Sequence, residues 1–149
     1  LWMIGSMKNK PRLVIDTNVL LVSISEKYQY HWIFQSLLKQ QFELAFTTEV
    51  LAEYEEIISA KYSPSVARNV IRTLLLLPNA VRTVVYYNWN MIQQDEDDNK
   101  FVDCAVSANA DAVITHDKHF NILREISFPP VTIMNIFELE VFLNKQTLQ

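Results

Sequence analysis

Glycine is almost absent from this sequence. Gly5 is the only glycine among the 149 residues, so none occurs from residue 6 onward. Phosphate-binding loops of the dinucleotide and P-loop kinds need glycine, because their backbone turns tightly and approaches the phosphates closely. The sequence therefore excludes nucleotide-binding enzymes of both classes.

Cysteine and long apolar runs are scarce as well. Cys104 is the only cysteine, so an internal disulfide and a cysteine-rich zinc site are excluded, and we expect Cys104 to be a small buried core residue. The leucine run at 74–77 ends at Pro78, far short of the roughly 20 residues that span a bilayer. These features predict a cytoplasmic protein with no membrane contact.

Length and charge limit how the chain can be organised. A chain of 149 residues is typical of one domain that buries a sizeable core. Residues 1–7 end in Gly-Ser-Met and resemble expression-vector sequence, so we expect a natural start at Met7 and a single domain over residues 8–149. The net charge is −4 without a lysine- or arginine-rich block, so nucleic-acid binding would depend on a local site.

Short apolar runs alternate with helical patterns along the chain. Strands are predicted at Arg12–Asp16, Glu43–Thr47, Val81–Tyr86, Ala112–Thr115 and Val131–Met134. Apolar residues at helical spacing occur in Val19–Ser25 and His31–Gln40, after Thr48, from Pro64 with its cap Ser63 to Pro78, after Asp98, and at the end of the chain. This alternation predicts an α/β fold, a three-layer α/β/α sandwich with a five-stranded, mostly parallel sheet.

Acidic residues follow strands whose carboxyl ends meet at one edge of such a sheet. Asp16 ends the first strand and Asp117 follows the fourth, and ligands of open α/β sheets bind at this edge. Asp98 begins the helix that leads into the fourth strand, and Glu53 lies one turn into the helix after the second strand. These four carboxylates can therefore converge on one rim.

Crowded carboxylates repel one another unless a cation neutralises them. Oxygen ligands without cysteine and without a histidine set suit Mg²⁺ or Mn²⁺ better than zinc. Such a cation accepts phosphate oxygens and acidifies a bound water, which makes phosphodiester hydrolysis the matching reaction. The residues alone leave a structural alternative open, in which Asp16 and Asp98 only cap helices and Glu53 belongs to a solvated stripe with Glu49 and Glu56.

The acidic run at 95–98 does not form a calcium-binding loop. Lys100 and Val106 stand where that loop needs glycine and glutamate. Asp103 lies about 140° around an ideal helix from Asp98. We therefore predict Asp103 as a secondary metal ligand, which shares the site only if Asp98 lies outside the regular helix.

The motifs together resemble the PIN domain family of metal-dependent ribonucleases, in particular its bacterial branch related to toxins of toxin–antitoxin pairs. The resemblance covers most of Leu13–Leu143 and rests on VIDTNVLL around Asp16, TTEVLAEYEEII around Glu53, and DEDDNKFVDCAVSANADAVITHD up to Asp117. It implies a five-stranded parallel sheet between helices, with the catalytic acids Asp16, Glu53, Asp98 and Asp117 binding Mg²⁺ or Mn²⁺. Asp103 falls where this branch often carries another acid, so it joins the expected metal ligands.

Three further positions are carried over from the family as supporting residues. The resemblance implies that Asn18 orients Asp16, the first aspartate of the cluster. Thr115 lies just before Asp117, the last aspartate of the cluster. His116 stands where this branch frequently has glycine, so its side chain either crowds the metal or contacts the scissile phosphate. His119 also lies close to Asp117, and on the residues alone both histidines are more typical of solvated positions than of a zinc site.

The resulting hypothesis is a metal-dependent endoribonuclease with an RNA substrate and, by the resemblance, an antitoxin protein as partner. A homo-oligomer is compatible with the sequence. The alternative is a catalytically weak module that binds RNA or an antitoxin and uses its acids for structure. An aspartyl phosphatase expects aspartate where Asn18 stands, and a receiver domain expects an aspartate after the third strand, so both are disfavoured.

Local cations, aromatic residues and asparagines complete the expectations. Six cations flank the expected rim and are either RNA contacts or ordinary solvated charges: Lys27, Lys61, Arg68, Arg72, Lys100 and Lys118. Tyr28, Tyr30 and Trp32 either stack on unpaired bases or pack against protein. Asn79, Asn88 and Asn109 stand near element ends, where a chain without glycine is expected to place asparagine in left-handed turns.

Overall fold

The sheet has five parallel strands in the computed structural model, which describes residues 10–148. The strands are β1 (Arg12–Ile15), β2 (Glu43–Phe46), β3 (Ala80–Arg82), β4 (Ala112–Ile114) and β5 (Ile133–Met134), in the spatial order β3-β2-β1-β4-β5. β1 is central, because Leu13 pairs with Leu44 of β2 and with Ala112 of β4. Since the strands are parallel, their carboxyl ends meet at one edge of the sheet.

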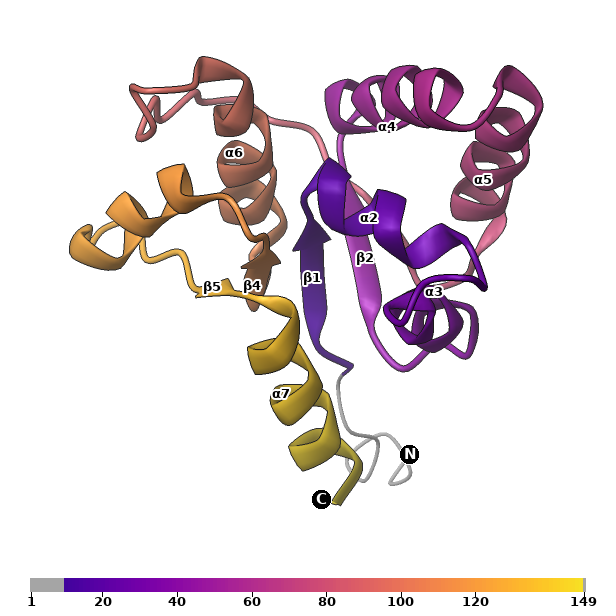
Figure 1. The fold of residues 1–149 in the computed structure, drawn as a ribbon. Helices are drawn as coiled ribbons and strands as arrows, with labels where there is room; N and C mark the ends of the chain where they lie inside the picture. Colours follow the sequence, from indigo (N-terminus) through magenta and orange to yellow (C-terminus); the bar gives the residue numbers. More distant parts are fainter. Residues whose placement is uncertain (1–9, 149) are drawn as a thin grey trace, which may run out of the picture.

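Helices cover both faces of the sheet (Figure 1). The helices α2 (Thr17–Ile24), α3 (His31–Leu38), α4 (Thr48–Lys61) and α5 (Pro64–Leu76) lie to the right of β1 in Figure 1. The helix α6 (Asn99–Ala108) lies to the left, with the 3₁₀ segments η1 (Glu96–Asp98) and η2 (Lys118–Glu125), and α7 (Ile136–Leu148) follows β5. Crossover connections between parallel strands are right-handed. The connections from β1 to β2 and from β2 to β3 therefore lie on one face of the sheet, and the connection from β3 to β4 lies on the other. The predicted three-layer α/β/α sandwich is confirmed.

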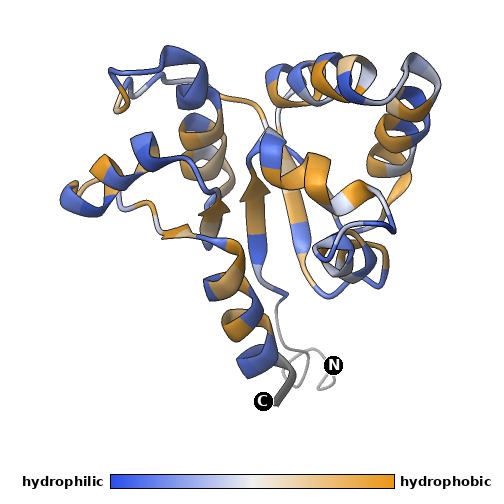
Figure 2. Ribbon diagram, viewed as in Figure 1, coloured by the Kyte–Doolittle hydropathy of each residue, from blue (hydrophilic) through white to orange (hydrophobic). Residues whose placement is uncertain are grey.

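The strands are buried because both of their faces carry apolar side chains. Leu13, Val14 and Ile15 of β1 are at most 1 % exposed, and Figure 2 shows much of the central sheet as hydrophobic. Tyr54 of α4 is fully buried and donates its hydroxyl hydrogen to the Ile15 carbonyl oxygen, which ties α4 to the end of β1. Cys104 is also fully buried, and burial raises the pKa of its thiol to about 12. It is a core residue, as expected.

The start signals of two helices are confirmed. Thr47 accepts a hydrogen bond from the Val50 N–H at the start of α4, and Ser63 accepts one from the Val66 N–H at the start of α5. α5 begins at Pro64, where a backbone N–H would have had no partner within the helix. The Thr47 cap fixes where α4 leaves the carboxyl end of β2, and therefore where Glu53 lies.

Three strands end one residue earlier than predicted, and two strands, β3 and β5, are shorter by more than that. β3 ends at Arg82 although the alternation continues to Tyr86. It is the edge strand beside β2, whose last residue accepts the Thr83 N–H, and β2 offers no further strand residue to pair with. β5 comprises only Ile133–Met134, the residues that pair with β4. The expected spans to residue 86 and from residue 131 are therefore wrong at those ends.

Left-handed backbone conformations occur without glycine. Gln40, Asn90 and Asn109 have φ angles of 61°, 51° and 53°. Asn109 ends α6 in this conformation, as expected. The expectation is wrong for Asn79 and Asn88, which are not among the described residues with positive φ. Asn79 is buried instead, and its side-chain amide donates to two backbone carbonyl oxygens.

Three expectations about the whole chain have different outcomes. The helices within the described residues are all too short or too polar to cross a membrane. The vector-like residues 1–7 lie outside the described part of the chain. The assignment of residues 8–149 to one domain stays a prediction.

Candidate metal centre

Asp16 is held at the end of β1 by contacts with the end of β4. Its backbone N–H donates to the Ile114 carbonyl oxygen at 2.9 Å, and its Oδ2 accepts a hydrogen bond from the Thr115 hydroxyl at 2.8 Å. The Thr115 hydroxyl oxygen in turn accepts the Asp117 N–H at 3.0 Å. Burial raises the pKa of Asp16, and the charges of Glu53 and Asp117 raise it further. Thr115 therefore links the two aspartates that the sequence predicts at this edge.

Asp98 reaches the same edge from the junction of η1 and α6. It occupies the N-cap position of α6, but its side chain makes no capping hydrogen bond. The residue is 8 % exposed, and its buried Oδ2 has no hydrogen-bond partner. Burial and the negative charge of Asp117 raise the pKa of Asp98 to about 8. A buried carboxylate without a partner calls for a compensating charge, so the capping alternative does not account for Asp98.

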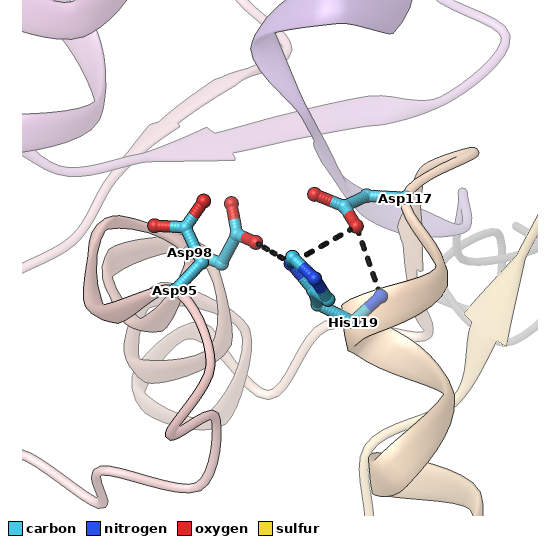
Figure 3. A group of neighbouring side chains, drawn as sticks. All are labelled: Asp95, Asp98, Asp117 and His119. Carbon is cyan, nitrogen blue, oxygen red and sulfur yellow. Dashed lines mark hydrogen bonds and ion pairs between the residues drawn. The ribbon is translucent and has the colours of Figure 1, made fainter.

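Two residues outside the predicted ligand set join this group. Asp95, Asp98, Asp117 and His119 each offer one ligand atom, and these atoms lie within 4.8 Å of one another (Figure 3). The Nδ1 atom of His119 lies 3.4 Å from Asp117 Oδ1 and 3.8 Å from Asp98 Oδ2. The side chain of His119 is 43 % exposed. It is therefore half-buried against the acids, whereas the sequence favoured a solvated position.

Short turns explain why the sequence did not single out these two residues. Asp117 accepts the His119 N–H at 2.9 Å and so begins η2, which turns His119 back toward the acids. Asp95 accepts the Asp97 N–H at 3.1 Å and begins η1 in the same way. The sequence offers one signal for such turns. An aspartate with a further polar residue two positions on favours a turn, because its carboxylate often accepts the N–H of that residue.

Glu53 lies beside the group, and two residues already bind its carboxylate. The Thr17 hydroxyl donates to its Oε2, and Lys100 Nζ lies 2.7 Å from its Oε1. The charge of Glu53 contributes to the raised pKa of Asp16, so the two carboxylates interact. The side chain of Lys100 is only 20 % exposed, and this candidate cation is a partner of the acids rather than a solvated charge.

Asp103 is not brought into the group, although the sequence predicts it as a secondary ligand. Its Oδ1 accepts the Trp89 N–H at 3.0 Å, and it lines a separate pocket of about 280 Å³ with Lys100. The helix period is the reason, because five residues along α6 turn Asp103 away from the side on which Asp98 lies. Burial raises the pKa of Asp103, and the Trp89 N–H lowers it.

Of the three supporting residues, Thr115 contacts an acid, whereas His116 and Asn18 are exposed. Successive residues of an extended chain point to opposite sides, so His116 faces away when Asp117 faces the acids. His116 is exposed and lines a hollow with Tyr30 and Trp32 next to the start of α7. Asn18 is exposed in the first turn of α2. Thr115 is the supporting residue that contacts an acid directly.

A groove of about 490 Å³ opens beside the group at His119. Lys118 lines it together with the polar side chains of Gln93, Gln94 and Asn121. The remaining candidate cations, Lys27, Lys61, Arg68 and Arg72, are exposed. Lys118 is therefore the candidate cation that lies in a groove adjoining the acids.

The arrangement suits a divalent cation better than it suits an anion alone. Burial and mutual repulsion raise the pKa values of the carboxyls at the edge where β1 and β4 end, and a bound cation would stabilise their charged forms, whereas an anion would destabilise them further. Carboxylate oxygens are the ligands of Mg²⁺ and Mn²⁺. The unpartnered Oδ2 of Asp98 is the atom for which a cation would supply the missing partner.

The residues of this site lie in a stretch that matches a known family. A family model described as PIN domain matches residues 12–119, which include Asp16, Glu53, Asp98 and Asp117. No curated protein matches the sequence.

Solved structures share the fold at low sequence identity. The structure of VapBC2 from Rickettsia felis, bound to a DNA fragment from their promoter, matches with a TM-score of 0.58 at 16 % identity, covering 83 % of this chain and 98 % of that chain. The RRP44 PIN domain of T. brucei matches with a TM-score of 0.52 at 10 % identity, covering 93 % of this chain and 82 % of that chain. The PIN domain endonuclease Utp24 has a TM-score of 0.49 at 19 % identity, with 84 % of each chain covered.

Proposed function

Because the chain belongs to the PIN domain family, we propose that it is a metal-dependent nuclease that hydrolyses phosphodiester bonds of RNA. The observation that carries the proposal is the convergence of Asp16, Asp98 and Asp117 from three separate elements, with raised pKa values at two of them. Such an arrangement costs folding free energy unless a cation binds. The free energy of cation binding would offset this cost.

The donor set fits Mg²⁺ or Mn²⁺. Asp16, Asp98 and Asp117 offer carboxylate oxygens, and Asp98 Oδ2 has no hydrogen-bond partner. When bound there, a divalent cation would neutralise the phosphodiester and acidify the attacking water. Asp103 stays outside this proposal as a direct ligand, because its Oδ1 accepts the Trp89 N–H in a separate pocket.

The chain's own residues orient the acids for this task. Thr115 fixes Asp16 by donating to its Oδ2 and holds the backbone of Asp117 through its own hydroxyl oxygen. Thr17 and Lys100 hold the Glu53 carboxylate next to Asp16. We assign to Glu53 the orientation of the attacking water or the binding of the cation. Pre-positioned groups of this kind lower the entropic cost of the reaction.

A purified-protein assay tests the proposal. With Mn²⁺ or Mg²⁺, the wild type should cut a 5′-labelled single-stranded RNA, and EDTA should stop the reaction. Asp16→Asn should abolish cutting, whereas Asp111→Asn should not, because Asp111 is an exposed residue at the amino end of β4. Cutting that survives Asp16→Asn would contradict the proposal. Thermal stabilisation by metal without any cutting would favour the alternative, a catalytically weak binding module.

The resemblance of the motifs to the toxin branch of the family extends the proposal to a biological role. We propose that the protein is the toxin of a toxin–antitoxin pair, with an antitoxin protein as its partner. Expression of the wild type should then arrest bacterial growth, and Asp16→Asn should not. Co-expression of a small protein encoded beside it should restore growth. Normal growth with active wild-type enzyme would contradict the toxin role while leaving the nuclease proposal in place.

A further inference from the structure

Asp95 and His119 extend the acidic site beyond Asp98 and Asp117. Asp95 lies beside Asp98 and His119 beside Asp117, and the two pairs face each other across a gap in which all four ligand atoms lie within 4.8 Å of one another (Figure 3). Asp95 comes from the turn before α6, and His119 comes from the turn after β4. The gap is therefore enclosed by residues from two segments that are distant in sequence.

Two polar atoms in this gap lack hydrogen-bond partners. Asp98 Oδ2 and His119 Nδ1 are both buried atoms without a hydrogen bond, and Asp98 as a residue is 8 % exposed. The Nδ1 atom lies 3.4 Å from Asp117 Oδ1 and 3.8 Å from Asp98 Oδ2, longer than a usual N–H···O hydrogen bond. Burying such atoms without a partner is costly, so the gap points to a missing ligand.

The spacing of the atoms is that of ligands around one ion. Atoms bound to a cation at roughly 2.1 Å lie about 3 Å apart when adjacent and about 4 Å apart when opposite. The measured separations of 3.4 Å and 3.8 Å fall within this range. All four ligand atoms lie within 4.8 Å of one another, so binding of a cation would draw the most distant of them inward.

The backbone holds the two additional residues in position. The Asp117 carboxylate accepts the His119 N–H at 2.9 Å, which fixes the start of η2. The Asp95 carboxylate accepts the Asp97 N–H at 3.1 Å through its Oδ1, and a carboxylate has a second oxygen that can bind a cation. The side chains therefore need little reorganisation to act as ligands.

We propose that Asp95, Asp98, Asp117 and His119 form a cation position with one nitrogen ligand, and that His119 makes it select Mn²⁺ over Mg²⁺. The inference rests on the metal centre of the proposed function: the position shares Asp98 and Asp117 with that centre and is completed by Asp95 and His119. Imidazole nitrogen binds transition-metal ions, whereas Mg²⁺ requires oxygen ligands and gives up its water reluctantly. A site with three carboxylates and one imidazole therefore favours a divalent transition-metal ion.

Pulsed electron paramagnetic resonance of the protein loaded with Mn²⁺ tests the nitrogen ligand directly. Electron spin-echo envelope modulation detects a ¹⁴N nucleus bonded to Mn²⁺, and it does not depend on catalytic activity. The wild type should show this modulation and His119→Ala should lose it. His116→Ala is the matched control and should keep it, because His116 lines the separate hollow beside α7.

Calorimetric titration with Mn²⁺ and Mg²⁺ tests the selectivity. In His119→Ala the Mn²⁺ affinity should fall at least about 10-fold, while the Mg²⁺ affinity should change less than about threefold. His119→Gln provides a second variant of similar polarity, and thermal melting in EDTA verifies that both variants fold. The half-exposed position of His119 makes both replacements tolerable.

The outcomes separate the inference from the proposed function. Metal-dependent RNA cutting without ¹⁴N modulation, or with equal Mn²⁺ affinity in the wild type and His119→Ala, would overturn the nitrogen ligand and leave the nuclease intact. Absence of any divalent binding would overturn the cation position, and the RNA assay would then decide the nuclease proposal separately. Modulation that His119→Ala removes and His116→Ala retains would support the inference.

Discussion

Replacing Asp98 with asparagine should stabilise the metal-free protein, although it removes a residue of the acidic site. Asp98 is 8 % exposed, and burial together with the charge of Asp117 raises its pKa to about 8. Asparagine has nearly the same shape and carries no charge. The replacement therefore removes the electrostatic cost and keeps the packing.

The size and the pH dependence of the effect follow from the pKa of Asp98. The folded pKa of about 8 lies above the ordinary value of 3.8, so between these values the unfolded chain releases a proton that the folded chain retains. Each pH unit in this window lowers wild-type stability by about 1.4 kcal/mol at most. Relaxation of neighbouring groups reduces this cost. We therefore expect Asp98→Asn to raise the free energy of unfolding by about 2–4 kcal/mol at pH 7, which corresponds to an increase of about 5–10 °C in Tm.

Urea unfolding in EDTA between pH 5 and 8.5 measures this effect. The stability difference between Asp98→Asn and the wild type should grow with pH up to about 8 and then level off. Asp97→Asn is the control, because Asp97 is the exposed neighbour, and it should change stability by less than about 0.5 kcal/mol. Added Mn²⁺ should stabilise the wild type far more than Asp98→Asn. A pH-independent difference, or a less stable Asp98→Asn protein in EDTA, would refute the reasoning.

Three further replacements probe other contacts of the structure. Lys100→Gln removes the ammonium 2.7 Å from Glu53 and should destabilise the metal-free protein by about 1–2 kcal/mol. Urea unfolding should show that Mn²⁺ raises the free energy of unfolding of this variant more than that of the wild type. Thr115→Val removes the hydroxyl that binds Asp16, so calorimetry should show weaker Mn²⁺ binding, and unchanged binding would contradict its orienting role. Asn79→Ala removes two buried hydrogen bonds far from the acids; it should cost about 2–3 kcal/mol without altering Mn²⁺ affinity.

Much of the fold could be predicted from the sequence because its local signals agree with its tertiary packing. The run before Asp16 is a strand that packs at the centre of the sheet, and Ser63 with Pro64 starts a helix where the cap signal indicates. The strand ends at 82 and 133 could not be predicted, because they depend on where the neighbouring strands stop pairing. Where two strands stop pairing is set by tertiary contacts, which the alternation within one strand does not record.

The candidate site was only partly predictable for a similar reason. The shared edge of a parallel sheet is enough to bring Asp16 and Asp117 together. His119 and Asp95 reach the acids through 3₁₀ segments, each of which begins where an aspartate accepts the N–H two residues on. Asp103 lies apart because a helix advances by 100° per residue, so a position five residues from Asp98 faces another pocket.

Anomalous diffraction from crystals soaked in Mn²⁺ tests the central claim most directly. The claim is that the carboxylates at the ends of β1 and β4, with Asp98, hold a divalent cation. It predicts an anomalous peak in contact with Asp98 and Asp117, and the loss of that peak in Asp98→Asn crystals. Mn²⁺ peaks found only elsewhere on the molecule, with Asp98 and Asp117 unligated, would contradict the account.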